Sequence, residues 1–115
     1  MAFSEIELKR IARDIEAFMA KHRPPPHLRS ELDLAHRVVG QSVELFEIRP
    51  RWDPPQELIE LAIAKATFVK TKRLWKIYWM RADLRWHAYQ PLPSVRSFEA
   101  FLTEVQKDPY HCFFG

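Results

Sequence analysis

The chain has 115 residues, 47% of them hydrophobic, and a net charge of +3 at neutral pH, so it is long enough for one domain, 1–115, with an ordinary buried core. Its single cysteine, Cys112, excludes an intramolecular disulfide framework. The N-terminus lacks the uninterrupted apolar segment of a secretory signal or a membrane span, so we expect a cytoplasmic protein that does not enter a membrane.

The first predicted element is an amphipathic helix that ends by about His22. Ser4 and Glu7 have the spacing of a capping box. Phe3 and Leu8 flank them at the positions of a hydrophobic staple. The apolar positions that follow recur at helical spacing: Ile11, Ile15, Phe18 and Met19. This pattern predicts one buried face and one solvated face.

Three consecutive prolines, Pro24–Pro26, end this helix because they cannot donate helix hydrogen bonds. They predict a rigid connector to the next element, or else a polyproline II segment that a partner could recognise.

Two antiparallel strands are predicted next, over 28–38 and 42–49. The first alternates apolar and polar residues, as a half-exposed strand does. Gly40 and Gln41 predict a tight turn, because glycine suits the first position of a type II′ turn. In the second strand the alternation changes phase between Leu45 and Phe46, which either a β-bulge or a strand buried on both faces would explain. The prolines at 50, 54 and 55 then predict a loop.

The third strand is predicted over 61–70, with a turn at Thr71 and Lys72 leading into Leu74. This pairing places Ala64 and Ala66 opposite Trp79 and Ile77, small side chains against large ones on the core side. The same pairing places Lys65 and Thr67 beside Tyr78 and Lys76 on a polar side.

A hairpin is predicted over 74–89, with Ala82 and Asp83 at a two-residue turn. In that register Trp79 lies opposite Trp86, and Tyr78 lies opposite His87. Trp86 then belongs to the core side, whereas the polar side carries Lys76, Tyr78, Met80, Arg85, His87 and Tyr89.

The chain becomes helical again after Pro91 and Pro93, with Ser94 or Ser97 as the N-cap and with Phe98, Phe101, Leu102 and Val105 on one face. The apolar tail from 110 to 115 is expected to dock against the core or against a neighbouring subunit. The order of helix, five strands and helix predicts an α+β fold, with an antiparallel sheet of about five strands and both helices packed on one face.

The predicted polar side of the sheet is the candidate functional site. Positions 65 to 85 hold seven basic residues and one acidic residue, Asp83. Cations next to aromatic rings suit an anionic ligand such as single-stranded nucleic acid. The candidate ligand-binding residues are Lys65, Lys76, Tyr78, Arg85, His87 and Tyr89. The same residue types are also typical of a merely solvated sheet face.

Two other functions fit the same residues. A small enzyme could use His87 as general acid or base, with Tyr78 opposite it and Lys65 as an electrostatic stabiliser. A structural protein, such as a homodimer, would bind no ligand at all. The adjacent His111 and Cys112 lack the spacing of a zinc site, so we expect no metal and no cofactor.

Four motifs carry a resemblance to a known family over the full length of the chain. They are RPPP at 23–26, FEIRP at 46–50, YWMRADLRWHAY at 78–89 and DPYHCFFG at 108–115. The chain resembles the domain of unknown function numbered 3024. The resemblance implies a small bacterial protein, and it implies no activity, substrate or catalytic residue.

Overall fold

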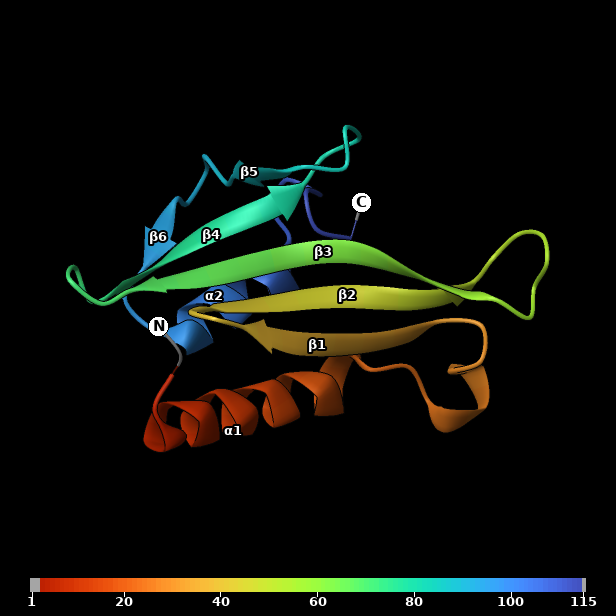
Figure 1. Ribbon diagram of the computed structural model, residues 1–115, viewed down its shortest axis with the longest axis horizontal. Helices are drawn as coiled ribbons and strands as arrows, with labels where there is room; N and C mark the ends of the chain where they lie inside the picture. Colours follow the sequence, from red (N-terminus) through yellow and green to blue (C-terminus); the bar gives the residue numbers. More distant parts are fainter. Residues whose placement is uncertain (1–2, 115) are drawn as a thin grey trace.

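The structure is a computed structural model that describes residues 3–114. Over these residues the elements are α1 (Glu5–His22), the short 3-10 helix η1 (Pro26–Leu28), β1 (Asp33–Val39), β2 (Ser42–Pro50), β3 (Leu58–Val69), β4 (Leu74–Met80), β5 (Trp86–Ala88), β6 (Ser94–Val95) and α2 (Phe98–Lys107). The strands form one antiparallel sheet in the order β1-β2-β3-β4-β5, and β6 also pairs with β4 (Figure 1). The predicted α+β fold is confirmed, with the two-residue strand β6 added to the five expected strands.

The N-terminus of α1 is capped as the sequence predicts. The Ser4 hydroxyl accepts a hydrogen bond from the backbone N–H of Glu7, and the Glu7 carboxylate accepts one from the N–H of Ser4. The predicted staple partner Leu8 is exposed, whereas Phe3 is buried and stacks on Trp75, with 5.6 Å between the ring centroids. Phe3 therefore joins the helix to the sheet.

The first strand begins later than predicted, at Asp33 instead of position 28. The intervening residues form η1 and a turn, in which the N–H groups of Glu31 and Leu32 both donate to the carbonyl of Leu28. Arg23 at the end of α1 then makes a two-pronged hydrogen bond to Asp33, with distances of 2.8 and 2.9 Å. The prolines shape a compact connector, which is the simpler of the two predicted roles.

The register between β2 and β3 shifts where the sequence pattern changes phase. Leu45 pairs with Ala64 and Phe46 pairs with Ala62, so the extra residue is Ile63 of β3. Leu45 lies on the helix side of the sheet, and Phe46 lies on the opposite side beneath the guanidinium of Arg37, 4.3 Å from its ring centroid. Both predicted explanations therefore contribute: there is a bulge, and β2 is buried on both faces at this point.

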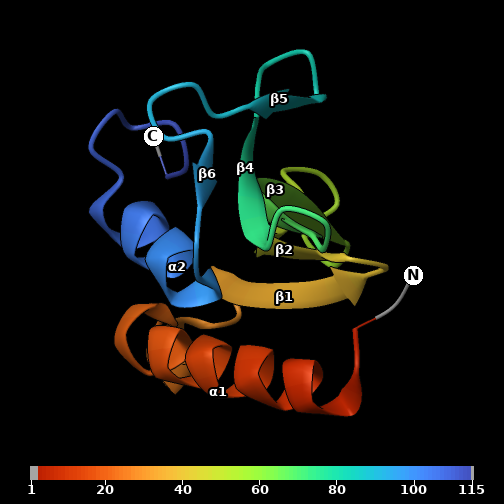
Figure 2. The ribbon, with the colours of Figure 1, turned by 90° about the vertical axis from the view of Figure 1, so that its left-hand side faces the viewer.

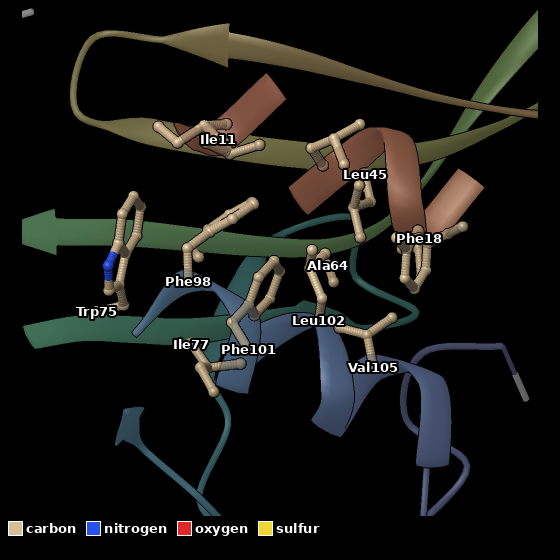
Figure 3. Close-up of a cluster of buried hydrophobic side chains, with 14 of the residues drawn as sticks. Ile11, Phe18, Leu45, Ala64, Trp75, Ile77, Phe98, Phe101, Leu102 and Val105 are labelled. Atoms are coloured by element: carbon tan, nitrogen blue, oxygen red, sulfur yellow. The ribbon is translucent and has the colours of Figure 1, made fainter. Parts of the chain in front are cut away.

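One hydrophobic core fills the space between the sheet and the two helices. Figure 2 shows α1 and α2 next to each other, and α2 contacts β3, β4 and β6. Figure 3 shows side chains of α1 and α2 meeting those of β2, β3 and β4. The core includes Ile11, Ile15, Phe18, Val43, Leu45, Ala64, Ala66, Trp75, Ile77, Tyr89, Phe98, Phe101, Leu102 and Val105. Within residues 3–114, α1 and α2 thus both cover one face of the sheet, and neither covers the other face.

The described part of the tail folds back onto this core. Asp108 ends α2 in the left-handed conformation, and its buried carboxylate accepts hydrogen bonds from the backbone N–H groups of Phe113 and Phe114. Phe113 is buried against Tyr89, with 4.8 Å between the ring centroids. Of the two predicted destinations for the tail, docking against its own core is the one observed for Phe113.

Candidate functional site

The β4–β5 hairpin has a different register from the predicted one. Trp79 pairs with His87 and Met80 pairs with Trp86, so the connecting loop has five residues, 81–85, and not two. The prediction that Trp79 faces Trp86 is wrong. Because side chains alternate along a strand, this shift of one residue moves every side chain of β5 to the opposite face.

Asp83 explains the longer loop. One of its carboxylate oxygens accepts a hydrogen bond from the backbone N–H of Arg85 (3.0 Å), and the other lies 2.8 Å from Nε2 of His87. The loop also closes through the N–H of Leu84, which donates to the carbonyl of Arg81, and Leu84 adopts a positive φ of 61°. The side-chain hydrogen bonds of Asp83 thus select this loop over a two-residue turn.

We call the sheet surface opposite the helices the outer face. The pairing of β2, β3 and β4 determines which side chains lie next to each other on this face. The sequence analysis predicted two of these pairs correctly, Lys65 with Tyr78 and Thr67 with Lys76. The residues that define it are Ser42, Glu44, Phe46, Lys65, Thr67, Lys76, Tyr78, Met80 and Trp86. Trp86 joins this face because of the five-residue loop.

Lys65 is the centre of the outer face. Its Nζ lies 4.9 Å from the ring centroid of Tyr78 and 5.0 Å from that of Trp86. Both distances are within the range of cation–π attraction. The ammonium group is therefore within cation–π reach of both rings, and Lys65 is only partly exposed.

The acidic side chains near Lys65 have other partners. Arg37 on β1 pairs with Glu44, with 3.6 Å between Nε and Oε1, and also with Glu60 on β3. Ser42 and Thr67 share a hydrogen bond of 2.7 Å. Arg37 thus largely neutralises the acidic side chains on the β1–β2 side of the outer face. The basic side chains near β4 form no such ion pair within residues 3–114.

The seven basic residues from 65 to 85 form no ion pair with any residue from 3 to 114, whereas several arginines elsewhere do. Lys65 and Lys76 lie on the outer face. The other five lie at the two ends of β4: Lys70, Lys72 and Arg73 in the β3–β4 turn, and Arg81 and Arg85 in the loop after β4. Strand β4 therefore runs between two clusters of basic side chains, which form no ion pair within residues 3–114, although Lys70 acts on the charge of Glu7 and Arg81 acts on that of Asp83.

A cleft of about 350 Å³ opens on the outer face beside β4. It lies where β5 and β6 pair with opposite ends of β4, so that the strands leave a gap between them. Its lining includes Lys72, Lys76, Tyr78, Ala88, Pro93 and Ser94. Tyr78 therefore contacts Lys65 and also forms part of the cleft wall.

The six candidate residues do not form one cluster. Lys65, Lys76 and Tyr78 share the outer face. Arg85 lies in the loop after β4. His87 is on the helix side of the sheet, where it is the cross-strand partner of Trp79, and Tyr89 is fully buried in the core. Sequence reasoning missed Trp86, although a signal was present: Ala-Asp is a poor pair for a two-residue turn, and Asp readily bonds the N–H two residues ahead.

The register also separates the proposed catalytic set. Tyr78 pairs with Ala88 and not with His87, so the imidazole lies on the opposite side of the sheet from Lys65 and Tyr78. Within 3–114, no three His, Cys, Asp or Glu side chains are grouped so as to hold a metal ion. The partner of His87 is Asp83, whose pKa is lowered chiefly by its hydrogen bond to that imidazole.

No helix in the described part of the chain is long and apolar enough to cross a membrane.

Comparison with known proteins places the chain in a family. No curated protein and no solved structure matches the chain. A family model does match, over residues 3–115. The chain therefore belongs to the family described as Domain of unknown function (DUF3024).

Proposed function

We propose that the outer face binds an anionic ligand, and that single-stranded nucleic acid is the ligand class it fits best. The observation that carries this proposal is the position of Lys65 within cation–π distance of the rings of Tyr78 and Trp86. It lies beside a strand whose two ends carry basic residues that form no ion pair within residues 3–114. Proteins that bind single strands without strong sequence preference combine a basic track with aromatic stacking platforms.

The cleft gives these groups separate roles. A base that enters it can stack on the side of Tyr78 that faces Ala88 and Pro93. Lys72 and Lys76 line the same cleft, where they can neutralise the flanking phosphates. Lys65 is restrained by its two rings, so less of its conformational freedom is lost on binding.

Binding of labelled single-stranded DNA and RNA, measured by fluorescence anisotropy at several salt concentrations, tests this proposal. Lys76→Met and Lys72→Met should weaken binding and reduce the slope of log K against log salt by roughly 0.7 for each lost phosphate contact. Lys21→Met, on the exposed surface of α1, is the matched control and should bind like the wild type.

The aromatic contribution has its own signature. Tyr78→Ala should lower affinity by about 1 to 3 kcal/mol per stacked base while leaving the salt slope unchanged, and Tyr78→Phe should bind like the wild type because it keeps the ring. Circular dichroism must first show that each variant is folded. Absence of oligonucleotide binding at about 50 mM salt would exclude nucleic acid. A rise in melting temperature with inorganic phosphate would then restrict the site to small anions.

A further inference from the structure

A second cleft lies on the helix side of the β4–β5 hairpin, and the proposed function does not use it. It has a volume of about 650 Å³, and its lining includes Trp79, Arg81, His87, Pro91 and Cys112. Trp79 and His87 form one cross-strand pair, on the opposite side of the sheet from Lys65 and Tyr78. The volume falls within the range of small-molecule sites.

The cationic group of this cleft is Arg81. Its guanidinium lies 5.5 Å from the ring centroid of Trp79 and forms no ion pair with any described residue. The nearby carboxylate of Asp83 already has two partners, because one oxygen accepts from the N–H of Arg85 and the other bonds to His87. Arg81 is therefore available for a bidentate hydrogen bond to an incoming carboxylate.

The rest of the wall is mostly uncharged. Trp79 and Pro91 supply apolar surface. The pKa of the Cys112 thiol is raised, by burial and by the negative charge of Asp108, so the thiol stays protonated near neutral pH. His87 is held in place by its 2.8 Å contact with Asp83. One cation beside an apolar wall matches a ligand with one carboxylate and an apolar body.

We propose that this cleft is a second binding site, which takes a small organic acid with a single carboxylate and an aromatic or apolar body. The carboxylate pairs with Arg81, and the apolar body lies against Trp79 and Pro91. This cleft is separate from the outer face, because none of its charged or aromatic groups lies on that face. Arg81 is also one of the basic residues at the ends of β4, so its variants are tested with phenylacetate and not with oligonucleotides.

Phenylacetate is a suitable probe, and 2-phenylethanol is its uncharged analogue. The chain has one cysteine, so alkylation by iodoacetamide reports on Cys112 alone. Phenylacetate should slow this alkylation, whereas 2-phenylethanol at the same concentration should have little effect. In a two-dimensional NMR spectrum of the four indole N–H groups, phenylacetate should shift the Trp79 signal and leave that of the exposed Trp52 unchanged.

Arg81→Met should weaken phenylacetate binding by roughly tenfold or more, because the charge-assisted hydrogen bonds are lost. Arg81→Lys, which keeps the charge, should retain part of the affinity. Arg85→Met is the control from the same loop, since Arg85 does not line the cleft, and it should bind like the wild type.

Two results would overturn the proposal. One is that phenylacetate at up to about 10 mM changes neither the Trp79 indole signal nor the alkylation rate. The other is that Arg81→Met and the wild type respond equally, because the carboxylate would then have no specific partner. The indole signal remains informative even if iodoacetamide reacts slowly with the partly buried thiol.

Discussion

The hydroxyl of Tyr89 donates a 2.8 Å hydrogen bond to the carboxylate of Glu104 and thereby joins the end of β5 to α2. Tyr89 is fully buried, and its ring packs on Phe113 of the tail. Burial, and then the acceptor and charge of Glu104, raise the pKa of Tyr89 well above its ordinary value, so the hydroxyl stays protonated. This residue was expected on the ligand-binding side, and it instead links the sheet, the second helix and the tail.

Removing this hydroxyl should destabilise the fold. Tyr89→Phe keeps the ring but leaves the Glu104 carboxylate without its donor, which should lower the free energy of unfolding by about 1 to 3 kcal/mol. Urea unfolding monitored by circular dichroism measures the loss. The control is Tyr110→Phe. Because Tyr110 is exposed, this variant should unfold at the wild-type midpoint. Equal midpoints for Tyr89→Phe and wild type would show that the hydrogen bond adds no stability.

The tail should contribute to stability through one buried ring. Phe113→Ala removes the contact with Tyr89 and leaves a cavity, so we expect a loss of about 3 to 5 kcal/mol in the free energy of unfolding. Phe114→Ala should cost much less, because that side chain is exposed. The comparison of the two variants separates loss of buried packing at Phe113 from a general effect of removing an aromatic ring from the tail. Similar unfolding midpoints for the two variants would contradict this assignment.

The helix-side core offers a third test at Ile15. This residue lies on the buried stripe of α1, and Ile15→Ala should cost about 2 to 5 kcal/mol. Ile6 belongs to the same helix but is exposed, so Ile6→Ala should stay within about 0.5 kcal/mol of the wild type. Thermal and urea unfolding both report the difference. A wild-type midpoint for Ile15→Ala would show that the stripe does not carry the packing of α1.

The sequence allowed much of the fold to be predicted because its local signals agreed. Gly40 adopts the positive φ that its turn requires, and the pairing of Ala64 with Trp79 follows from matching small side chains to large ones. The start of β1 was placed five residues too early, since hydrophobic alternation continues through a segment that the carbonyl of Leu28 closes into a turn. Hydrophobic pattern alone does not show where a backbone turn uses its hydrogen bonds.

The candidate site could be predicted only in part, for a related reason. Lys65, Lys76 and Tyr78 were placed together because the β3–β4 turn is short and its register follows from side-chain size. Trp86 and His87 were exchanged between faces because the β4–β5 register depends on hydrogen bonds made by the Asp83 side chain. The residue types make such bonds possible but do not fix their geometry, and a shift of one residue reverses both faces.

The paired side chains of Arg23 and Asp33 should make the stability of the fold depend on pH. The hydrogen bonds from Arg23 lower the pKa of Asp33 below its ordinary 3.8, so folding favours the ionised carboxylate. Its contribution to stability is therefore fully present above pH 3.8 and is lost as the pH falls through the lower pKa of the folded state. Asp33→Asn removes the charge at every pH.

The free energy of unfolding of the wild type should exceed that of Asp33→Asn by a constant amount from about pH 5 to pH 7. This difference should shrink as the pH falls from about 4 to about 2, because the wild-type carboxyl becomes protonated and can no longer accept both hydrogen bonds from Arg23. Glu16→Gln, on the exposed side of α1, should match the wild type at every pH and serves as the control. Urea unfolding across this pH range measures the three proteins together. A difference that stays constant down to pH 2, or that grows on acidification, would show that the Asp33 carboxylate is not stabilised by folding.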